Sequence, residues 1–171
     1  RTLEWKLDRI WALEAGGPDE PGTLWCGTLP GGLFRSDDFG ATWRINEPLW
    51  YEPRRKQWMG GGADLPGLHS ILVDPRDSKR IICGVSCGGV WVTADGGKSW
   101  DCRAEGIWAE YAPPEHKHNP VIQDVHRLAR CQAVPDTLWA QHHNGIFRST
   151  NAAELWTDIS HLKAISPTSF G

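Results

Sequence analysis

The sequence has little of what marks nucleic-acid-binding and membrane proteins. The formal net charge is only −3, and the basic residues are scattered apart from a short run at 54–56. The broad positive surface that nucleic-acid binding needs is therefore missing. No apolar stretch approaches the length of a membrane span, and no signal peptide is visible after Arg1. We expect neither a nucleic-acid partner nor a membrane.

Cysteine is scarce and odd in number, which excludes a complete set of internal disulfides. The five cysteines cannot all pair within one chain. Cys83 and Cys87 fall in what reads as a strand and its turn, which is not the arrangement of a zinc knuckle. Reduced, partly buried thiols are the expectation, and such thiols favour a reducing, cytoplasmic location.

Tyrosine, phenylalanine and helical patterns are also sparse. The chain has 2 tyrosines and 4 phenylalanines against 11 tryptophans, together with 19 glycines and 12 prolines. The best helical pattern, at 125–132, is short and is followed by Pro135. Tryptophan with abundant glycine and proline indicates many short strands joined by tight turns. The length of 171 residues suits one domain, and we predict an all-β fold.

One short motif occurs three times. Residues 36–43 and 93–100 both fit hydroxyl-x-Asp-x-Gly-x-hydroxyl-Trp, and they start 57 positions apart (93 minus 36). A third copy at 149–156 starts 56 positions later (149 minus 93); it keeps the first hydroxyl and the tryptophan, but asparagine replaces the aspartate and the glycine is lost. The defining residues are Ser36, Asp38, Gly40, Trp43, Thr93, Asp95, Gly97, Trp100, Asn151 and Trp156.

The similarity between the copies extends upstream of the motif. Each unit reads as strand, turn, strand, glycine-rich turn, strand, motif and strand. Four antiparallel strands recurring at this spacing make a β-propeller blade. We predict that residues 1–171 form a partial β-propeller. Its blades cover about 5–49, about 68–107 and about 125–162, with long interblade loops at about 46–68 and 104–125.

The motif has a physical explanation as a hairpin. The aspartate accepts backbone N–H bonds within its own turn, and the glycine takes a positive-φ position that side chains disfavour. The tryptophan buries a large ring that anchors the hairpin on its blade. In the third copy Asn151 still permits an Asx-type turn. We therefore assign the motif to structure and place no chemistry on it.

These residues resemble the Asp box, or BNR repeat, of the sialidase-like propeller families. The chain is most similar to bacterial BNR-repeat proteins named as glycosyl hydrolases or exo-α-sialidases. The resemblance implies a propeller but not a function, because hydrolases, photosystem assembly factors and sorting receptors share the fold. The sequence departs from the sialidase pattern: it has no Arg-Ile-Pro element, and neither Tyr51 nor Tyr111 lies in a recognisable family context.

Three blades are fewer than the roughly four to eight of known propellers, in which ring closure protects the edge strands. We expect the chain to be part of a ring of about six or seven blades, the others coming from a longer chain. A ring closed by self-association is the less favoured alternative.

The interblade loops carry the candidate functional residues. Propeller geometry places these loops on the face opposite the motif hairpins. The two loops also repeat each other in sequence: residues 47–52 match residues 105–110 at an offset of 58 (105 minus 47). Long loops in a compact domain are commonly binding or lid elements. The predicted ligand-binding residues are Trp50, Asp64, His69, Trp108, His126, His142 and His143.

Three hypotheses remain open from the sequence. The main one is a propeller that binds a carbohydrate, another small ligand or a partner. The alternative is a glycoside hydrolase, in which Glu52 and Glu110 serve as acid and base; for repeated positions a structural role is favoured. The third is metal-assisted hydrolysis, with His69 and His126 sharing a metal with His142 or His143. We expect bracing histidines instead, with no resident metal or cofactor.

Overall fold

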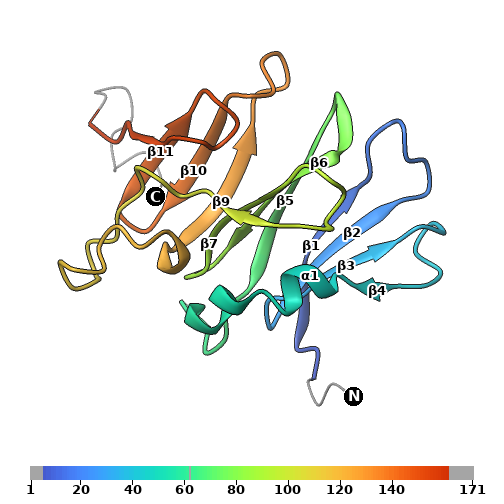
Figure 1. The fold of residues 1–171 in the computed structure, drawn as a ribbon, viewed down its shortest axis with the longest axis horizontal. Coiled ribbons are helices and arrows are strands. Elements are labelled where there is room, and N and C mark those ends of the chain that lie inside the picture. Colours follow the sequence, from blue (N-terminus) through green and yellow to red (C-terminus); the bar gives the residue numbers. More distant parts are fainter. Residues whose placement is uncertain (1–5, 62, 162–171) are drawn as a thin grey trace, which may run out of the picture.

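The computed structural model describes residues 6–61 and 63–161, which form three separate antiparallel sheets (Figure 1). Each sheet has four strands in sequential order, so each is a meander of the kind that builds a propeller blade. The all-β, partial-propeller prediction is confirmed. The first blade holds β1 (Arg9–Ala15), β2 (Leu24–Leu29), β3 (Leu33–Ser36) and β4 (Arg44–Ile45); the second holds β5 (Leu68–Asp74), β6 (Asp77–Val85), β7 (Gly89–Thr93) and β8 (Asp101–Cys102); the third holds β9 (Val125–Arg130), β10 (Leu138–His142), β11 (Gly145–Ser149) and β12 (Thr157–Asp158).

Short helices lie in the interblade loops, where the sequence pattern indicates only irregular chain. They are α1 (Glu47–Trp50) and the 3₁₀ turns η1 (Pro53–Gln57) and η2 (Pro120–Ile122). Each begins with a proline in its first turn and a capping side chain before it: Asn46, Glu52 and Asn119 each accept a backbone N–H. Such caps satisfy amides that a helix start leaves unpaired. No helix in the described ranges is long and apolar enough to cross a membrane.

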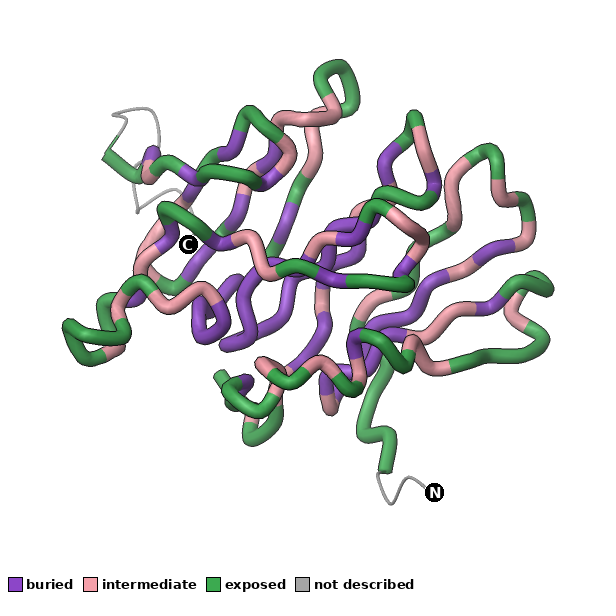
Figure 2. Tube along the Cα trace, in the orientation of Figure 1, coloured by how far each residue is buried: buried purple, intermediate pink, exposed green. Residues whose placement is uncertain are grey.

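The first strands of the three blades, β1, β5 and β9, lie beside one another and contact in sequence order. The outer strands fan away from them, as in the ring of a propeller (Figure 1). Burial is greatest along the middle strands of each sheet and falls toward the turns (Figure 2). The chain thus places each core between two neighbouring blades.

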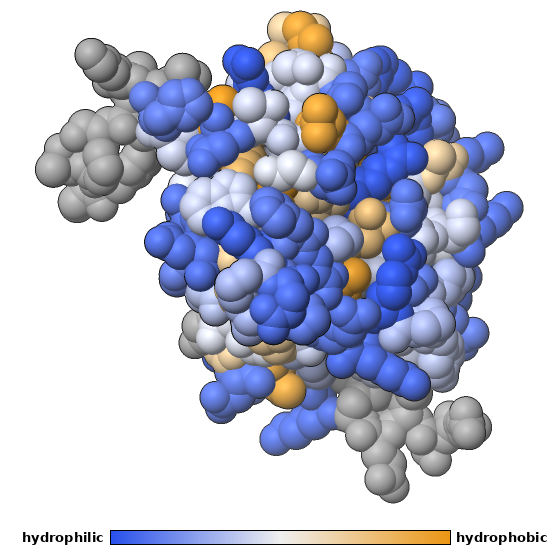
Figure 3. All heavy atoms as spheres, turned by 60° about the vertical axis from the view of Figure 1, so that its left-hand side comes forward, coloured by the Kyte–Doolittle hydropathy of each residue, from blue (hydrophilic) through white to orange (hydrophobic). Residues whose placement is uncertain are grey.

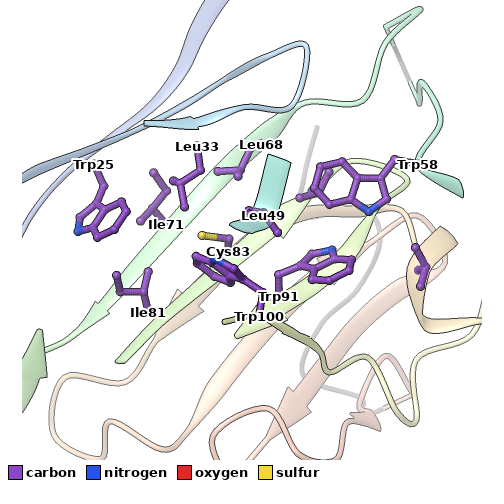
Figure 4. Close-up of a cluster of buried hydrophobic side chains, with 12 residues drawn as sticks. Trp25, Leu33, Leu49, Trp58, Leu68, Ile71, Ile81, Cys83, Trp91 and Trp100 are labelled. Atoms are coloured by element: carbon purple, nitrogen blue, oxygen red, sulfur yellow. The ribbon is translucent and has the colours of Figure 1, made fainter. Parts of the chain in front are cut away.

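Tryptophan fills much of the core between the first and second blades. Trp25 and Trp91 are fully buried, and Trp58 from the first interblade loop packs edge-on against Trp91 with ring centroids 5.5 Å apart (Figure 4). Burying a large apolar side chain contributes roughly 1.5–3 kcal/mol. A second cluster, which includes Leu128 and Phe147, joins the second and third blades. Hydrophobic burial between blades therefore holds the three sheets together.

The motif turns are closed by their own side chains. Asp38 accepts the backbone N–H of Thr42 at 2.8 Å and its hydroxyl at 2.6 Å, and these bonds lower the pKa of Asp38 to about 2. Asp95 accepts the same pair of bonds from Ser99, at 2.9 and 2.6 Å. In the third blade Asn151 accepts only a backbone N–H at this position. The geometry agrees with a structural role for these turns.

The second and third motif tryptophans bond to the preceding blade. The indole of Trp100 donates to Asn46 at the end of the first blade, and that of Trp156 donates to the carbonyl of Arg103, each at 2.9 Å. Trp43 instead donates within its own turn and stays 39% exposed. The sequence pattern assigns each tryptophan to its own hairpin, whereas in the structure the later two also tie neighbouring blades together.

The motif turns lie at the same end of each blade as the turn between its first two strands. The residue after the aspartate or asparagine has positive φ, and its N–H donates to a carbonyl in that first turn or at the start of the strand that follows it. The three bonds are Phe39 to Gly22, Gly96 to Lys79 and Ala152 to Asp136. Because strands in a meander alternate in direction, the interblade loops end at the opposite face.

Candidate functional site

Polar side chains from three parts of the chain meet at the loop face between the second and third blades. Asp124 and His126 flank the first residue of β9, and His143 lies in the turn between β10 and β11. The ligating atoms of these three residues all lie within 4.8 Å of one another. Asp124 is buried, while both histidines are exposed. We call these three residues the Asp–His–His cluster.

Asp124 is held by the second blade. Its Oδ1 accepts the hydroxyl of Ser86 and the backbone N–H of Cys87, each at 3.2 Å. Its Oδ2 faces Nε2 of His126 at 3.1 Å. Burial alone would raise the pKa of Asp124, but His126 and Cys87 lower it below the usual value overall. The carboxylate is therefore charged at neutral pH and points one oxygen at the histidines.

His143 is positioned by its backbone. Its N–H donates to the carbonyl of Asp124 at 3.1 Å, and its Nδ1 lies 3.8 Å from Asp124 Oδ2. Its ring stands nearly perpendicular to that of His126, with centroids 6.0 Å apart, and to that of Tyr111, at 5.4 Å. The side chain remains 58% exposed. A ligand arriving from solvent therefore meets His143 and Tyr111 together.

His142 lies beneath the cluster and differs from its neighbour. It is 3% exposed, and its ring stacks on Tyr111 and packs edge-on against Phe147. Burial lowers the pKa of His142 to about 4, so the ring is neutral. Its Nδ1 accepts the N–H of Asn144 at 3.2 Å. His142 therefore supports Tyr111 from the core side rather than facing solvent.

His69 braces two blades. Its Nε2 lies 2.6 Å from the carbonyl of Val125, and its Nδ1 lies 2.9 Å from the hydroxyl of Ser70. A carbonyl only accepts, so Nε2 carries the proton and Nδ1 accepts from Ser70. Burial lowers the pKa of His69 to about 4. The neutral ring thus joins β5 to the start of β9.

The two candidate glutamates are not equivalent, although the sequence repeats around them. Glu52 accepts the backbone N–H and the guanidinium of Arg54, which holds its pKa below the usual value. Glu110 is exposed, and its N–H donates to the side chain of Asn144. Glu52 is thus the N-cap of the 3₁₀ turn η1, whereas Glu110 is exposed next to Tyr111 in the second interblade loop.

The candidate tryptophans each carry a cation over the ring. The guanidinium of Arg55 lies 3.6 Å from the ring centroid of Trp50, and the ammonium of Lys117 lies 4.3 Å from that of Trp108. Both tryptophans are half-buried, so one face of each ring is used within the protein. Asp64 lies in the glycine-rich part of the first interblade loop.

Sequence reasoning missed Asp124 and the contribution of Tyr111. One signal was available: Asp124 precedes His126 by two positions, and residues so spaced share a side of a strand. The contact of Asp124 with Ser86 spans 38 residues and two blades, so no local pattern marks it. The structure places His126 and His143 together, with His142 below them and His69 on the adjoining strand.

A groove of about 690 Å³ lies on the outward face of the third blade. It is mainly apolar, and its lining includes Trp139, Ile146 and Ile159 together with Arg127, His142 and His143. The side of the molecule turned toward the viewer in Figure 3 is largely hydrophilic, with isolated hydrophobic spots. Propeller blades stack face to face, so this groove is where the fold would seat another blade.

Comparison with known proteins gives one distant curated relative, and no family model matches the chain. A protein of Neosartorya fischeri described as a probable oligoxyloglucan-reducing end-specific xyloglucanase is 32% identical over 90 residues. The match covers 51% of this chain and 10% of the relative. The chain therefore spans only a small part of the curated relative.

Solved propellers match over nearly the whole chain. An ancestral GH74 enzyme aligns with a TM-score of 0.63 at 18% identity, over 90% of this chain and 18% of its own. The GH74 xyloglucanase of Xanthomonas campestris gives 0.59 at 18% identity, over 92% and 24%. YCF48 bound to D1 peptide gives 0.51 at 12% identity, over 91% and 45%. At these identities the likeness establishes the β-propeller fold.

Proposed function

We propose that the chain is part of a ligand-binding β-propeller whose interblade-loop face binds a carbohydrate or another small polar ligand. The observation that carries this proposal is the convergence of the Asp–His–His cluster with the half-exposed ring of Tyr111. A charged carboxylate and two imidazoles offer hydrogen bonds to hydroxyl groups, and an aromatic face packs against the apolar side of a sugar. The site lies where long loops cross the seam between two blades.

The xyloglucanase relatives support a carbohydrate as the ligand class. They also support a longer ring, because the chain spans from about a tenth to a quarter of their length. We propose that blades at about 5–49, 68–107 and 125–162 are consecutive members of a sialidase-like Asp-box ring. The apolar groove on the third blade then seats the next blade of that ring, with self-association the less favoured way to close it.

The test is a binding measurement with defined oligosaccharides. Isothermal titration calorimetry of the chain against xyloglucan oligosaccharides and sialyllactose should detect one site per chain. Replacing Tyr111 by Leu should weaken binding more than tenfold, whereas Tyr111→Phe, which keeps the ring, should bind within a few-fold of the parent. Tyr51→Leu is the matched control, because Tyr51 is 54% exposed on the other interblade loop. Unchanged affinity in Tyr111→Leu would exclude this ring as the binding surface.

Glycoside hydrolysis is the second candidate, favoured by the xyloglucanase relative. In that case Glu52 and Glu110 are the paired carboxylates. A general acid needs a raised pKa, and Glu52 has a lowered one, so Glu52 would act as the base or nucleophile and Glu110 as the acid. Activity on chromogenic glycosides should fall at least a hundredfold in Glu52→Gln and in Glu110→Gln. Turnover that survives both changes would exclude this pair.

The other predicted ligand contacts form part of the same proposal. Trp50, Asp64 and Trp108 lie in the interblade loops and extend the binding face beyond the cluster. Lys117 and Arg55 cover one face of the two tryptophans, so a sugar would meet the opposite faces or the cations themselves. The affinity of the alanine variant at each of these positions, measured in the same calorimetric titration, would show which residues contact the ligand.

A further inference from the structure

We infer that the Asp–His–His cluster binds one divalent transition-metal ion, with zinc as the best match. One carboxylate and two imidazoles make a nitrogen- and oxygen-rich donor set that suits zinc. The inference goes beyond ligand binding by the loop face, because these donors would hold a metal whether or not a carbohydrate binds. It also departs from the expectation that the chain has no resident metal.

The distances between donor atoms suit a small ion. Zinc bonds of about 2.0–2.2 Å in a tetrahedral shell separate neighbouring donors by roughly 3.3–3.5 Å. Asp124 Oδ2 lies 3.1 Å from His126 Nε2 and 3.8 Å from His143 Nδ1. These two separations bracket the tetrahedral value, and the third, between the histidine nitrogens, is at most 4.8 Å. Seating the ion would therefore need the two exposed imidazoles to close by up to about 1.5 Å.

The carboxylate is oriented as a metal ligand usually is. Outer hydrogen bonds fix metal ligands and tune their basicity. Asp124 uses Oδ1 for Ser86 and Cys87, which leaves Oδ2 directed at the histidines. His143 is fixed through its own N–H to the carbonyl of Asp124. The carboxylate and the backbone of His143 are therefore held by contacts that do not use the ligating atoms, and the His143 ring packs against Tyr111.

Backbone strain and close packing concentrate at the same place. Cys87, which donates its N–H to Asp124, has φ of 45°, a left-handed conformation that is unfavourable for a residue with a side chain. Gly61 approaches from the first interblade loop, where a Cβ would lie 2.7 Å from the Ser86 hydroxyl and 3.2 Å from Asp124 Oδ1. The surrounding chain thus holds the Asp124 carboxylate in one position.

The fourth coordination position faces solvent. Both histidines are exposed, and Cys87 is not among the residues whose ligating atoms lie within 4.8 Å of one another. Three protein ligands with one open position are typical of zinc sites that bind water or a ligand oxygen. A sugar hydroxyl or a carboxylate could occupy it. The metal would then polarise that group, while Tyr111 supports the remainder of the ligand.

Metal content and affinity test the site directly. The full chain, treated with chelator and then dialysed against zinc chloride, should hold one zinc per chain by elemental analysis. His126→Ala and His143→Ala should each weaken zinc binding more than tenfold in calorimetric titration. His118→Ala is the matched control. His118 lies on the same interblade loop as Asp124, but it is not part of the cluster. Circular dichroism of each variant confirms that it is folded.

Two results would overturn the inference. One is a parent chain that retains no more zinc than the folded His126→Ala and His143→Ala variants. The other is an equal loss in His118→Ala, which would indicate scattered surface binding. Both measurements are made without carbohydrate, so a failure to bind sugar leaves them unaffected.

Cobalt substitution tests the open position. Cobalt bound by one carboxylate and two imidazoles should give visible absorption without an intense near-ultraviolet thiolate band, and Cys87→Ser should keep the same spectrum. A strong thiolate band that disappears in Cys87→Ser would place Cys87 on the metal and contradict an open fourth position.

Discussion

Arg130 on the inner strand of the third blade donates to the carboxylate of Asp74 on the second blade at 3.0 Å, and both side chains are at most 4% exposed. Arg76 also binds this carboxylate, and these arginines hold the pKa of Asp74 far below its usual value. A buried ion pair of this kind fixes how the two blades are aligned. Removing one partner leaves a buried charge with less compensation.

Arg130→Met should therefore destabilise the chain strongly. We expect a loss of about 3 kcal/mol in the free energy of unfolding, at the lower end for a broken buried pair because Arg76 still contacts Asp74. Arg80→Ala is the control: its guanidinium lies 3.9 Å from Asp74 and is 49% exposed, so it should cost about 0–1 kcal/mol. Urea unfolding measures both. An equal loss of unfolding free energy in Arg130→Met and Arg80→Ala would show that the buried Arg130–Asp74 pair contributes no more to stability than the exposed arginine.

Two histidines that the fold keeps neutral predict that stability falls on mild acidification. His69 and His142 each have a pKa of about 4 in the fold, caused by burial, against about 6.5 in an unfolded chain. Between these values the unfolded chain takes up protons that the folded chain does not. Each histidine therefore removes roughly 1.4 kcal/mol of stability per pH unit as pH falls through this window.

Replacing His69 by Gln tests this pH dependence, because the amide keeps a donor for the carbonyl of Val125 but does not titrate. Unfolding free energies measured in urea between pH 7 and 4.5 should fall less steeply for His69→Gln, by roughly 1.4 kcal/mol per pH unit. An unchanged slope would show that the His69 ring is not kept neutral by the fold.

Asn46 links the first blade to the motif turn of the second. Its Oδ1 accepts both the amide of Leu49 at the start of α1 and the indole of Trp100, and its Nδ2 donates to the carbonyl of Gly97. We expect Asn46→Ala to lose about 2–3 kcal/mol, since a helix cap and a buried indole lose their partner together. Asn46→Asp keeps the acceptor and should lose less. Thermal unfolding of both variants gives the comparison, and equal losses would assign the effect to the Nδ2 donor alone.

The repeated turns were predictable from the sequence, whereas the polar cluster was not. Asp38 and Asp95 bond to residues within four positions, so a local pattern carries the whole interaction. Asp124 accepts a hydrogen bond from Ser86, 38 residues earlier in the chain. It also lies 3.8 Å from His143, which is in the turn between β10 and β11. Contacts of that range depend on how blades align, which a single sequence does not express.

Residues at matching positions of the repeat do not have the same surroundings in the structure. Glu52 and Glu110 occupy matching positions in the two interblade loops, yet one caps a 3₁₀ turn and the other is exposed at the rim. The difference comes from the residues after each glutamate: Pro53 and Arg54 start a turn at once, whereas Tyr111 packs on the histidines of the third blade. The packing partner, and not the repeat, decides the role.

The third motif turn offers a test of how the side-chain network stabilises a blade. In the second blade Asp95 accepts both the N–H and the hydroxyl of Ser99, whereas in the third Asn151 accepts only the N–H of Leu155, which has no hydroxyl. Leu155 is 52% exposed, so its replacement removes little buried surface. The missing hydroxyl bond can therefore be restored without disturbing the core.

We expect Asn151→Asp combined with Leu155→Thr to stabilise the chain by about 1 kcal/mol, the usual net value of an added hydrogen bond, while each single change stays within about 0.5 kcal/mol of the parent. The effect depends on both partners, so the double-mutant cycle should show a coupling near the full gain. Unfolding free energies of the four proteins provide that coupling. Additive effects would mean that the carboxylate and the hydroxyl do not meet, and that the third turn differs from the second in backbone as well as in side chains.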